Sequence, residues 1–291
     1  MANGVDEKTI RQHFTELVKH VCYEATSPFQ FEPFHKAIFE PIDYYSFGIE
    51  FMRSLVEDVK LVGQDQLKLM QSKLLNKDNI VLFANHQTEA DPQLISVALE
   101  KDFPEIAKQM IFVAGERVVT DPLAIPFSKG RNLLCIYSKR YIDIPPEQKL
   151  QKQLHNKKTM ETMSLLLSQG GQIIYVAPSG GRDRKNDDGL IQIAPFDPQS
   201  IEMFLLMAKR AKRPTHFHTL ALSTYDLLPP PVSIQTELGE QRLCQKTKIG
   251  FYFDEAIDLE KYAHLGDKHM IRQMRADELT KQVETNYQSL I

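Results

Sequence analysis

Residues 80–91 read Ile-Val-Leu-Phe-Ala-Asn-His-Gln-Thr-Glu-Ala-Asp, and a proline follows. The first five are apolar and partly β-branched, which predicts a buried strand over Ile80–Ala84. Asp91 before that proline is typical of a helix N-cap, so we expect a helix over Gln93–Glu100. His86 then lies in the loop at the carboxyl end of a strand, where open α/β sheets usually keep their chemistry.

His86 and Asp91 can act together because a short loop can return on itself. The carboxylate of Asp91 would hold one ring nitrogen of His86, and the other nitrogen would be left to take a proton from a substrate hydroxyl. A purely structural interpretation stays open, since an aspartate before a proline is often only a helix cap and a loop histidine often only a hydrogen-bonding group. A metal site is disfavoured because no third ligand is near and the spacing fits none of the usual patterns.

The composition of the 291 residues is that of an ordinary soluble globular protein, with 42% hydrophobic and 25% charged residues. A net charge of −3 argues against a nucleic-acid binder. No apolar run approaches the ~18 residues that span a bilayer, so we expect peripheral membrane contact at most. The amino terminus lacks the features of a signal or transit peptide. The three cysteines are far apart, which indicates reduced thiols in a reducing compartment.

Two patterns follow one another along the chain. The first 75 or so residues read as helices only, including one whose apolar face runs from Phe47 to Val56, and they predict a small helical bundle over residues 1–77. From residue 78 to 291 short apolar runs alternate with helices, which predicts an α/β domain with a mixed, mostly parallel sheet flanked by helices. The expected strands are Ile80–Ala84, Met110–Ala114, Leu133–Tyr137, Gln172–Ala177, Phe217–Leu222 and Ile249–Phe253.

Basic residues follow two of these strands. Lys139 and Arg140 follow Leu133–Tyr137 after one serine, and Arg182 and Arg184 follow the strand that ends at Ala177. A guanidinium group can donate two parallel hydrogen bonds to the oxygens of one phosphate, so these residues can hold an anion beside His86. By itself, however, the Gly-Gly-Arg-Asp-Arg segment could equally be a turn with solvated arginines.

No protein nucleophile stands out. Ala177-Pro178-Ser179-Gly180-Gly181 only faintly resembles a nucleophile elbow, because the first glycine is missing and the proline restricts the turn. Cys135 lies inside an expected strand. The simplest chemistry is therefore attack by a substrate hydroxyl on an already activated acyl group.

Taken together, these motifs resemble a known family. His86–Asp91 is similar to the H-x4-D box of glycerolipid acyltransferases, and the segments Phe112–Pro122, Ala177–Arg184 and Tyr225–Pro231 resemble the soluble plastid-type glycerol-3-phosphate acyltransferases. The resemblance covers most of the chain from about residue 79 onward. It implies transfer of a fatty acyl group from an acyl-carrier-protein thioester, or from acyl-CoA, to the first hydroxyl of glycerol 3-phosphate, with no cofactor or metal.

The resemblance also implies roles for individual residues. His86 would take the hydroxyl proton, and Asp91 would hold and stabilise the imidazolium. The residues implied for the phosphate are Lys139, Arg140, Arg182 and Arg184. One position departs from the pattern: plant members have histidine after the basic pair, and this chain has Tyr141.

Three further expectations follow from the resemblance. The protein partner is the acyl carrier protein, and glycerol 3-phosphate is the acceptor. The location is the bacterial cytoplasm, or the plastid stroma if the chain is a mature plant form. The alternatives are a 1-acylglycerol-3-phosphate acyltransferase and a non-catalytic protein that binds acyl carrier protein or phospholipid.

Overall fold

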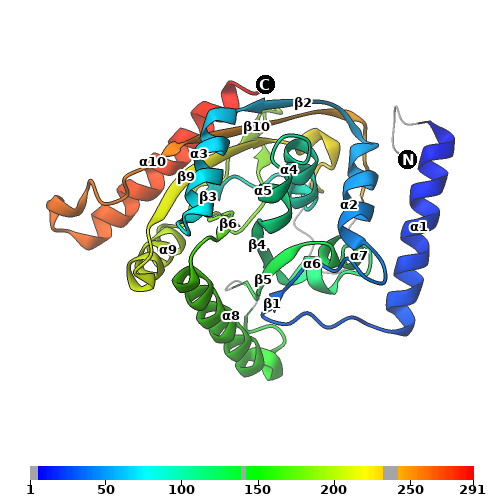
Figure 1. Cartoon of the computed structure of the whole chain (residues 1–291), viewed down its shortest axis with the longest axis horizontal. Helices are drawn as coiled ribbons and strands as arrows, with labels where there is room; N and C mark the ends of the chain where they lie inside the picture. Colours follow the sequence, from blue (N-terminus) through cyan, green and yellow to red (C-terminus); the bar gives the residue numbers. More distant parts are fainter. Residues whose placement is uncertain (1–5, 139–141, 232–241) are drawn as a thin grey trace.

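The computed structural model describes residues 6–138, 142–231 and 242–291. In this part of the chain an eight-stranded sheet forms the centre of the molecule (Figure 1). In order across the sheet the strands are β1 (Phe34–His35), β5 (Asn132–Ile136), β4 (Ile111–Gly115), β6 (Ile173–Val176), β3 (Asn79–Ala84), β9 (Thr215–Ser223), β10 (Thr247–Ala256) and β2 (Val56–Val62). A separate hairpin pairs β7 (Arg184–Lys185) with β8 (Ile191–Gln192).

The sheet is mixed and mostly parallel, as predicted. β5, β4, β6, β3 and β9 run parallel to one another, β10 is antiparallel to β9, and β1 is antiparallel to β5. All six expected strands are present, within a few residues of their predicted bounds. Because the parallel strands share one direction, the segments that follow β3, β4, β5, β6 and β9 meet at one edge of the sheet.

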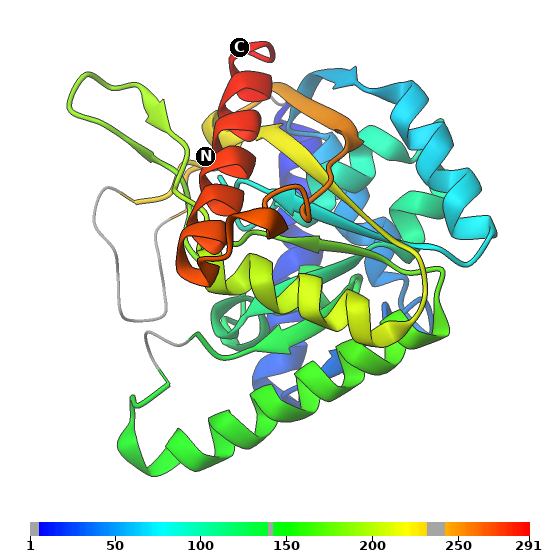
Figure 2. The same cartoon turned by 90° about the vertical axis from the view of Figure 1, so that its left-hand side faces the viewer.

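Both faces of the sheet are covered, because side chains alternate along each strand. In β3, Ile80 and Leu82 point into one hydrophobic cluster while Val81 and Phe83 point into the other. The helices that pack on the first face are α1 (Glu7–Thr26), α2 (Tyr44–Arg53), α3 (Gln64–Leu75), α4 (Asp91–Leu99), α5 (Pro104–Gln109), α6 (Glu116–Thr120) and α7 (Ile125–Lys129). Those on the second face are α8 (Lys149–Gln169), α9 (Pro198–Ala211) and α10 (Lys268–Gln288), which lie side by side in Figure 2.

Aspartate caps begin several of these helices. Asp6, Asp43, Asp197 and Asp267 each accept hydrogen bonds from backbone N–H groups in the first turn, which satisfies donors that a helix leaves unpaired. Short 3-10 helices lie at Pro146–Gln148, Tyr225–Leu227 and Ala263–Leu265. Among the described helices we find no candidate for a bilayer-spanning segment.

The expectation of helices only in the first 75 residues is wrong, because β1 and β2 belong to the main sheet. α2 ends at Arg53, and Val56, expected on that helix, begins a strand that runs parallel to β10. The apolar spacing in this segment fits a helix, but distant pairing decides its structure. After β2 the chain must turn at Gly63, with φ of 86°, where a Cβ would lie 1.9 Å from the carbonyl oxygen of Phe253.

Residues on both sides of position 77 share one hydrophobic cluster. Leu17, Ile49 and Met70 belong to the same cluster as Ile80 and Leu94. The predicted division into domains 1–77 and 78–291 stays a prediction. The packing shows only that the amino-terminal helices cover the first face of the sheet.

A buried ion pair fastens the end of α1 to this face. Lys129, at the end of α7, contacts Glu24 with Nζ and Oε1 2.5 Å apart, and it also donates to the hydroxyl of Tyr44 at 3.1 Å. Both charged residues are buried, and the ammonium lies 4.8 Å from the ring centroid of Phe29. The pair therefore joins α1 to the α/β layers through a buried polar contact.

We expect Glu24→Ala to lower the free energy of unfolding by about 3–5 kcal/mol, because it leaves the buried ammonium of Lys129 without its carboxylate partner. Glu16→Ala, an exposed change on the same helix, is the matched control and should change stability by less than about 0.5 kcal/mol. Urea unfolding measures both. Equal effects of the two substitutions would show that the ion pair does not anchor α1.

Candidate active site

The loop that follows β3 lies at the edge where the parallel strands end. It spans residues 85–90 and leads into α4. Asn85, Gln87 and Thr88 are fully buried, although they are polar. A buried loop must pair its own backbone and side-chain polar groups, and the contacts around it therefore determine its shape.

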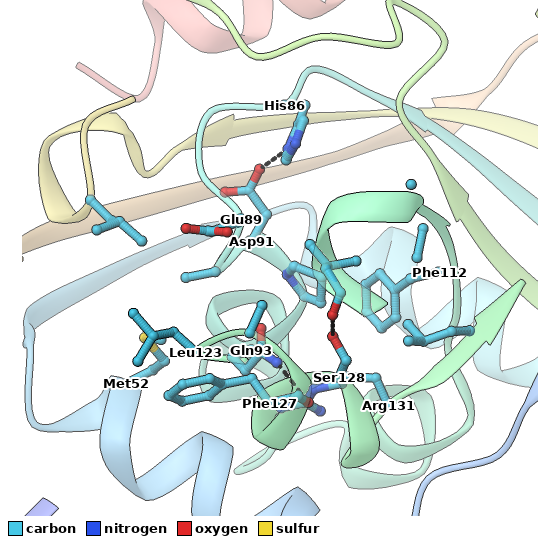
Figure 3. A pocket seen from close by; sticks show the side chains of 18 of the residues that line it. Met52, His86, Glu89, Asp91, Gln93, Phe112, Leu123, Phe127, Ser128 and Arg131 are labelled. Carbon is cyan, nitrogen blue, oxygen red and sulfur yellow. Dashed lines mark hydrogen bonds and ion pairs between the residues drawn. The ribbon is translucent and has the colours of Figure 1, made fainter. Parts of the chain in front are cut away.

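His86 and Asp91 form the predicted pair. Nδ1 of His86 lies 2.8 Å from Oδ2 of Asp91, and the side chains are 30% and 0% exposed respectively. Because a carboxylate only accepts, Nδ1 carries the proton in this contact and Nε2 is the nitrogen that can take another. Figure 3 shows the pair at one end of the cavity that it helps to line.

Asp91 is held by more donors than His86 alone. Its carboxylate accepts from the backbone N–H of Gln87 at 2.9 Å, from the N–H of Thr88 at 3.3 Å and from the hydroxyl of Thr224 at 2.7 Å. The predicted N-cap role is wrong: α4 begins at Asp91 itself, and Ala90 occupies the N-cap position. The carboxylate turns back into the preceding loop because the donors there satisfy a buried charge.

Asp183, in the loop after β6, joins that loop to residues 85–90. Its carboxylate accepts from the amides of Asn85 at 2.8 Å and Gln87 at 3.2 Å and from the N–H of Ala194 at 2.9 Å. Its own N–H donates to the carbonyl oxygen of His86 at 2.6 Å. Burial raises the pKa of this carboxyl to about 6. Sequence reasoning missed this role, since an aspartate between two arginines in a polar segment carries no sign of burial.

The segment directly after β9 also contacts the loop that carries His86, through Thr224. Besides its hydroxyl contact with Asp91, its backbone N–H donates to Oε1 of Gln87 at 2.7 Å. Nothing in the local sequence marks this threonine, because its partners are more than 130 positions away.

The predicted arginines lie next to Asp183, Arg182 at the end of the loop after β6 and Arg184 at the start of β7. Arg182 and Arg184 flank Asp183, and both are half-buried. The turn before them passes through Gly180, whose φ of 63° favours glycine, and a Cβ there or at the next glycine would meet open space. Arg184 also donates to the carbonyl oxygen of Pro231.

The other half of the predicted anion clamp cannot be placed. Lys139, Arg140 and Tyr141 lie outside the described residues. The structure therefore places the segment that carries Arg182 and Arg184 beside His86, and the part assigned to Lys139 and Arg140 stays a prediction.

A mostly apolar cavity of about 450 Å³ extends from His86 between the sheet and the helices of the first face. Its residues come from α1, α2, α4, α6, α7, β4, β5 and β6, so the amino-terminal helices form part of its wall. Residues that line it include Phe14, Leu17, Phe51, Met52, Phe112, Val118, Leu123, Phe127, Leu133 and Leu228. A long apolar chain could be shielded from water here with its reactive end at His86.

Arg242 and Glu89, which line the same cavity, form a cluster of charged residues with Asp121. Arg242 donates to Glu89 through Nε at 2.5 Å and Nη2 at 3.1 Å, and to Asp121 through Nη2 at 2.8 Å. Burial opposes the charge on Arg242, but the hydrogen bonds to the two carboxylates outweigh it and raise its pKa. Sequence reasoning missed the cluster, whose members are separated by 121 and 153 positions.

Comparison with known proteins places this arrangement in a family. Residues 58–223, more than half of the chain, match the acyltransferase family. The chain is 41% identical over 264 residues to a chloroplastic glycerol-3-phosphate acyltransferase of Cucurbita moschata, covering 90% of this chain and 59% of that protein. It is 40% identical over 263 residues to the chloroplastic glycerol-3-phosphate acyltransferase of Spinacia oleracea, covering 89% and 56%. The chain thus spans less than two thirds of the length of these relatives.

A solved structure is also similar. The 1-acyl-sn-glycerophosphate (LPA) acyltransferase PlsC of Thermotoga maritima aligns with 83% of this chain and 78% of its own, with a TM-score of 0.44 and 17% identity.

The raised pKa of Asp183 predicts how its contribution to stability depends on pH. A carboxyl whose pKa rises from about 4 in the unfolded chain to about 6 in the folded protein stabilises fully below pH 4, and this contribution is lost as the pH rises through 6. We expect the free energy of unfolding of the wild type, relative to Asp183→Asn, to fall by about 3 kcal/mol between pH 4 and pH 7. Denaturant unfolding across this range measures it, and a constant difference would contradict the burial argument.

Proposed function

This chain belongs to the acyltransferase family, and we propose that it transfers a fatty acyl group from a thioester donor to the sn-1 hydroxyl of glycerol 3-phosphate. The product is 1-acylglycerol 3-phosphate. Support comes from the relatives in Cucurbita moschata and Spinacia oleracea, which are about 40% identical and carry the name glycerol-3-phosphate acyltransferase.

The observation that carries the proposal is the position of the His86–Asp91 pair. The imidazole is partly exposed at one end of an apolar cavity, whereas the carboxylate that orients it is fully buried. A base between water and an apolar cavity suits a reaction that joins a water-soluble alcohol to a fatty acyl chain. The arginine-bearing loop tied to His86 by Asp183 adds the charge that a phosphate requires.

The reaction proceeds by direct attack. Nε2 of His86 takes the proton of the sn-1 hydroxyl while the oxygen attacks the thioester carbonyl carbon. The carbon–oxygen bond forms, the carbon–sulfur bond breaks, and the thiolate takes the proton from the imidazolium. Asp91 holds the ring in the correct tautomer and stabilises its positive charge between these steps. In this scheme the substrate hydroxyl is the nucleophile, and the reaction requires no cofactor or metal.

Binding of the acceptor depends on its phosphate. Arg182 and Arg184 are the described residues that we assign to it, and Lys139 and Arg140 complete the set as a prediction outside the described residues. Guanidinium groups match phosphate oxygens in geometry as well as charge. Holding the phosphate orients the sn-1 hydroxyl toward Nε2 of His86.

The acyl donor and the location are further proposals. An acyl carrier protein is the donor we favour, with acyl-CoA as the alternative, since both present the acyl group as a thioester. We propose the plastid stroma for a mature plant form and the cytoplasm for a bacterial one.

We expect His86→Ala to lower kcat by about 10²–10⁴-fold, because it removes the general base. The assay offers a radiolabelled acyl donor with either glycerol 3-phosphate or its 1-acyl derivative as acceptor. The control is His264→Ala, an exposed histidine far along the chain. A folded His86→Ala variant with wild-type kcat would exclude this residue as the base, and preference for the acylated acceptor would overturn the proposed substrate.

Arg182→Ala should raise the KM for glycerol 3-phosphate by about 10-fold or more, because a hydrogen bond to a charged group is lost. Arg184→Ala should act in the same direction, although it also loses the contact with Pro231. The KM for the acyl donor should stay unchanged. Arg213→Ala is the matched control, since that exposed arginine precedes β9 at the opposite edge of the sheet. An unchanged KM for the acceptor in both variants would remove the phosphate assignment.

A further inference from the structure

Exposed basic side chains gather at the edge of the sheet where β3 and β9 begin, opposite the edge that carries His86. Lys77 is in the turn between α3 and β3. Arg210, Lys212 and Arg213 are at the end of α9 and in the turn that leads to β9, and all four are exposed. We call these four residues the basic patch. Figure 2 shows the two turns on the side of the molecule away from the β7–β8 hairpin.

Contacts between the starts of β3 and β9 hold the two turns together. The backbone N–H of Asn79 donates to the carbonyl oxygen of Pro214 at 2.8 Å. Nε2 of His216 lies 2.9 Å from Oδ2 of Asp78. The basic residues that precede these contacts are therefore neighbours in the folded protein, although they are far apart in the sequence.

The patch keeps its positive charge. Two carboxylates at this edge are already engaged, Asp78 with His216 and Glu260 with Lys209. In the part of the chain that the structure describes, none of the four patch residues forms an ion pair. The whole chain has a net charge of −3, so this local excess of cations is not the consequence of a basic composition.

Two of the patch lysines occupy backbone positions that favour glycine. α3 ends in a Schellman motif, in which the N–H of Lys77 donates to the carbonyl oxygen of Leu74 and the N–H of Asp78 to that of Lys73, both at 3.0 Å. Lys77 has φ of 66°, and Lys212 ends α9 with φ of 55°. Among the described residues, these are the only non-glycine residues with positive φ. A Cβ is strained there, so both charges are present at a cost in stability.

An exposed leucine lies beside these cations. Leu75 is the last residue of α3, two positions before Lys77. At 79% it is the most exposed large hydrophobic side chain in the described part of the chain. A leucine gains from leaving water, whereas lysine and arginine keep their charged ends at a polar surface. The surface of an anionic bilayer meets both requirements, with negative head groups above hydrocarbon.

We propose that the basic patch and Leu75 bind the surface of an anionic lipid bilayer. Each basic residue near such a surface strengthens binding about fivefold. His86 lies beyond the far end of β3, whose six residues span about 20 Å, so the active site stays open to water-soluble substrates. An acidic donor protein on the patch would face away from His86. The proposal does not depend on the proposed function, although the product of that reaction is an amphiphile that a bilayer can take up.

Sedimentation with lipid vesicles tests the binding. The wild type should bind vesicles that contain phosphatidylglycerol and should not bind vesicles of phosphatidylcholine alone. Salt should weaken the binding, because it screens the attraction between exposed charges. A wild type that fails to bind the phosphatidylglycerol vesicles at low salt would overturn the proposal. So would a wild type that binds soluble polyglutamate through the patch but no vesicles, since the partner would then be an acidic protein.

Lys77→Gly and Lys212→Gly, made together, remove two charges and also relieve both strained positions. We expect vesicle affinity to fall about 25-fold, while the free energy of unfolding stays the same or increases. Lys157→Gln and Lys158→Gln, two exposed changes on α8, remove the same charge elsewhere and should change vesicle affinity less than about twofold. Acyl transfer to glycerol 3-phosphate without vesicles should be unchanged in both double variants. Equal losses of vesicle affinity in the two would show that only the net charge matters and would refute the patch.

Leu75→Ser tests the apolar part of the surface separately. It should lower vesicle affinity about tenfold, because one leucine side chain no longer enters the hydrocarbon. This loss should persist at high salt, unlike the loss caused by the two glycine substitutions. Wild-type affinity in Leu75→Ser would contradict the assignment of that residue to the bilayer surface.

Discussion

The buried carboxylate of Asp91 constrains the loop that carries the chemistry. A fully buried charge is stable only when donors surround it. Asp91 has donors from His86, Gln87 and Thr88 within its own loop, and one from Thr224 beyond β9. Because releasing any of them would weaken the support of the charge, the loop keeps one shape. That shape engages Nδ1 of His86 and leaves Nε2 as the nitrogen that can take a proton.

The parallel sheet extends this constraint to the neighbouring loops. β3 lies between β6 and β9, so the segments that follow these three strands are adjacent at one edge. Asp183 joins the loop after β6 to Asn85 and Gln87, and Thr224 joins the segment after β9 to the same glutamine. The result is a polar edge in which two buried carboxylates hold three loops together. On one side of that edge, the helices of the first face enclose an apolar cavity.

Local sequence patterns predicted those parts of the fold that depend on neighbours in the chain. The six buried strands are short apolar runs, and their predicted positions are confirmed. The strand β2 could not be predicted in this way, because Val56–Val62 is a partly exposed strand whose conformation comes from pairing with β10, about 190 positions later. The cap predicted at Asp91 was wrong for a similar reason. An aspartate before a proline usually caps its own helix. Here the carboxylate instead accepts hydrogen bonds from donors in the preceding loop and from Thr224.

The sequence by itself determined the strand, the loop and the helix around His86, the pairing of that histidine with Asp91, and the arginines that follow a neighbouring strand. These features depend on residues a few positions apart, where hydrophobic spacing and side-chain chemistry suffice. Only the tertiary structure decided the roles of Asp183 and Thr224. Each is defined by burial and by distant contacts, among them one with a residue 98 positions away and one with a residue 137 positions away, and burial is a property of the packed chain. The same reason applies to the cavity, since its walls are brought together only when the amino-terminal helices pack on the sheet.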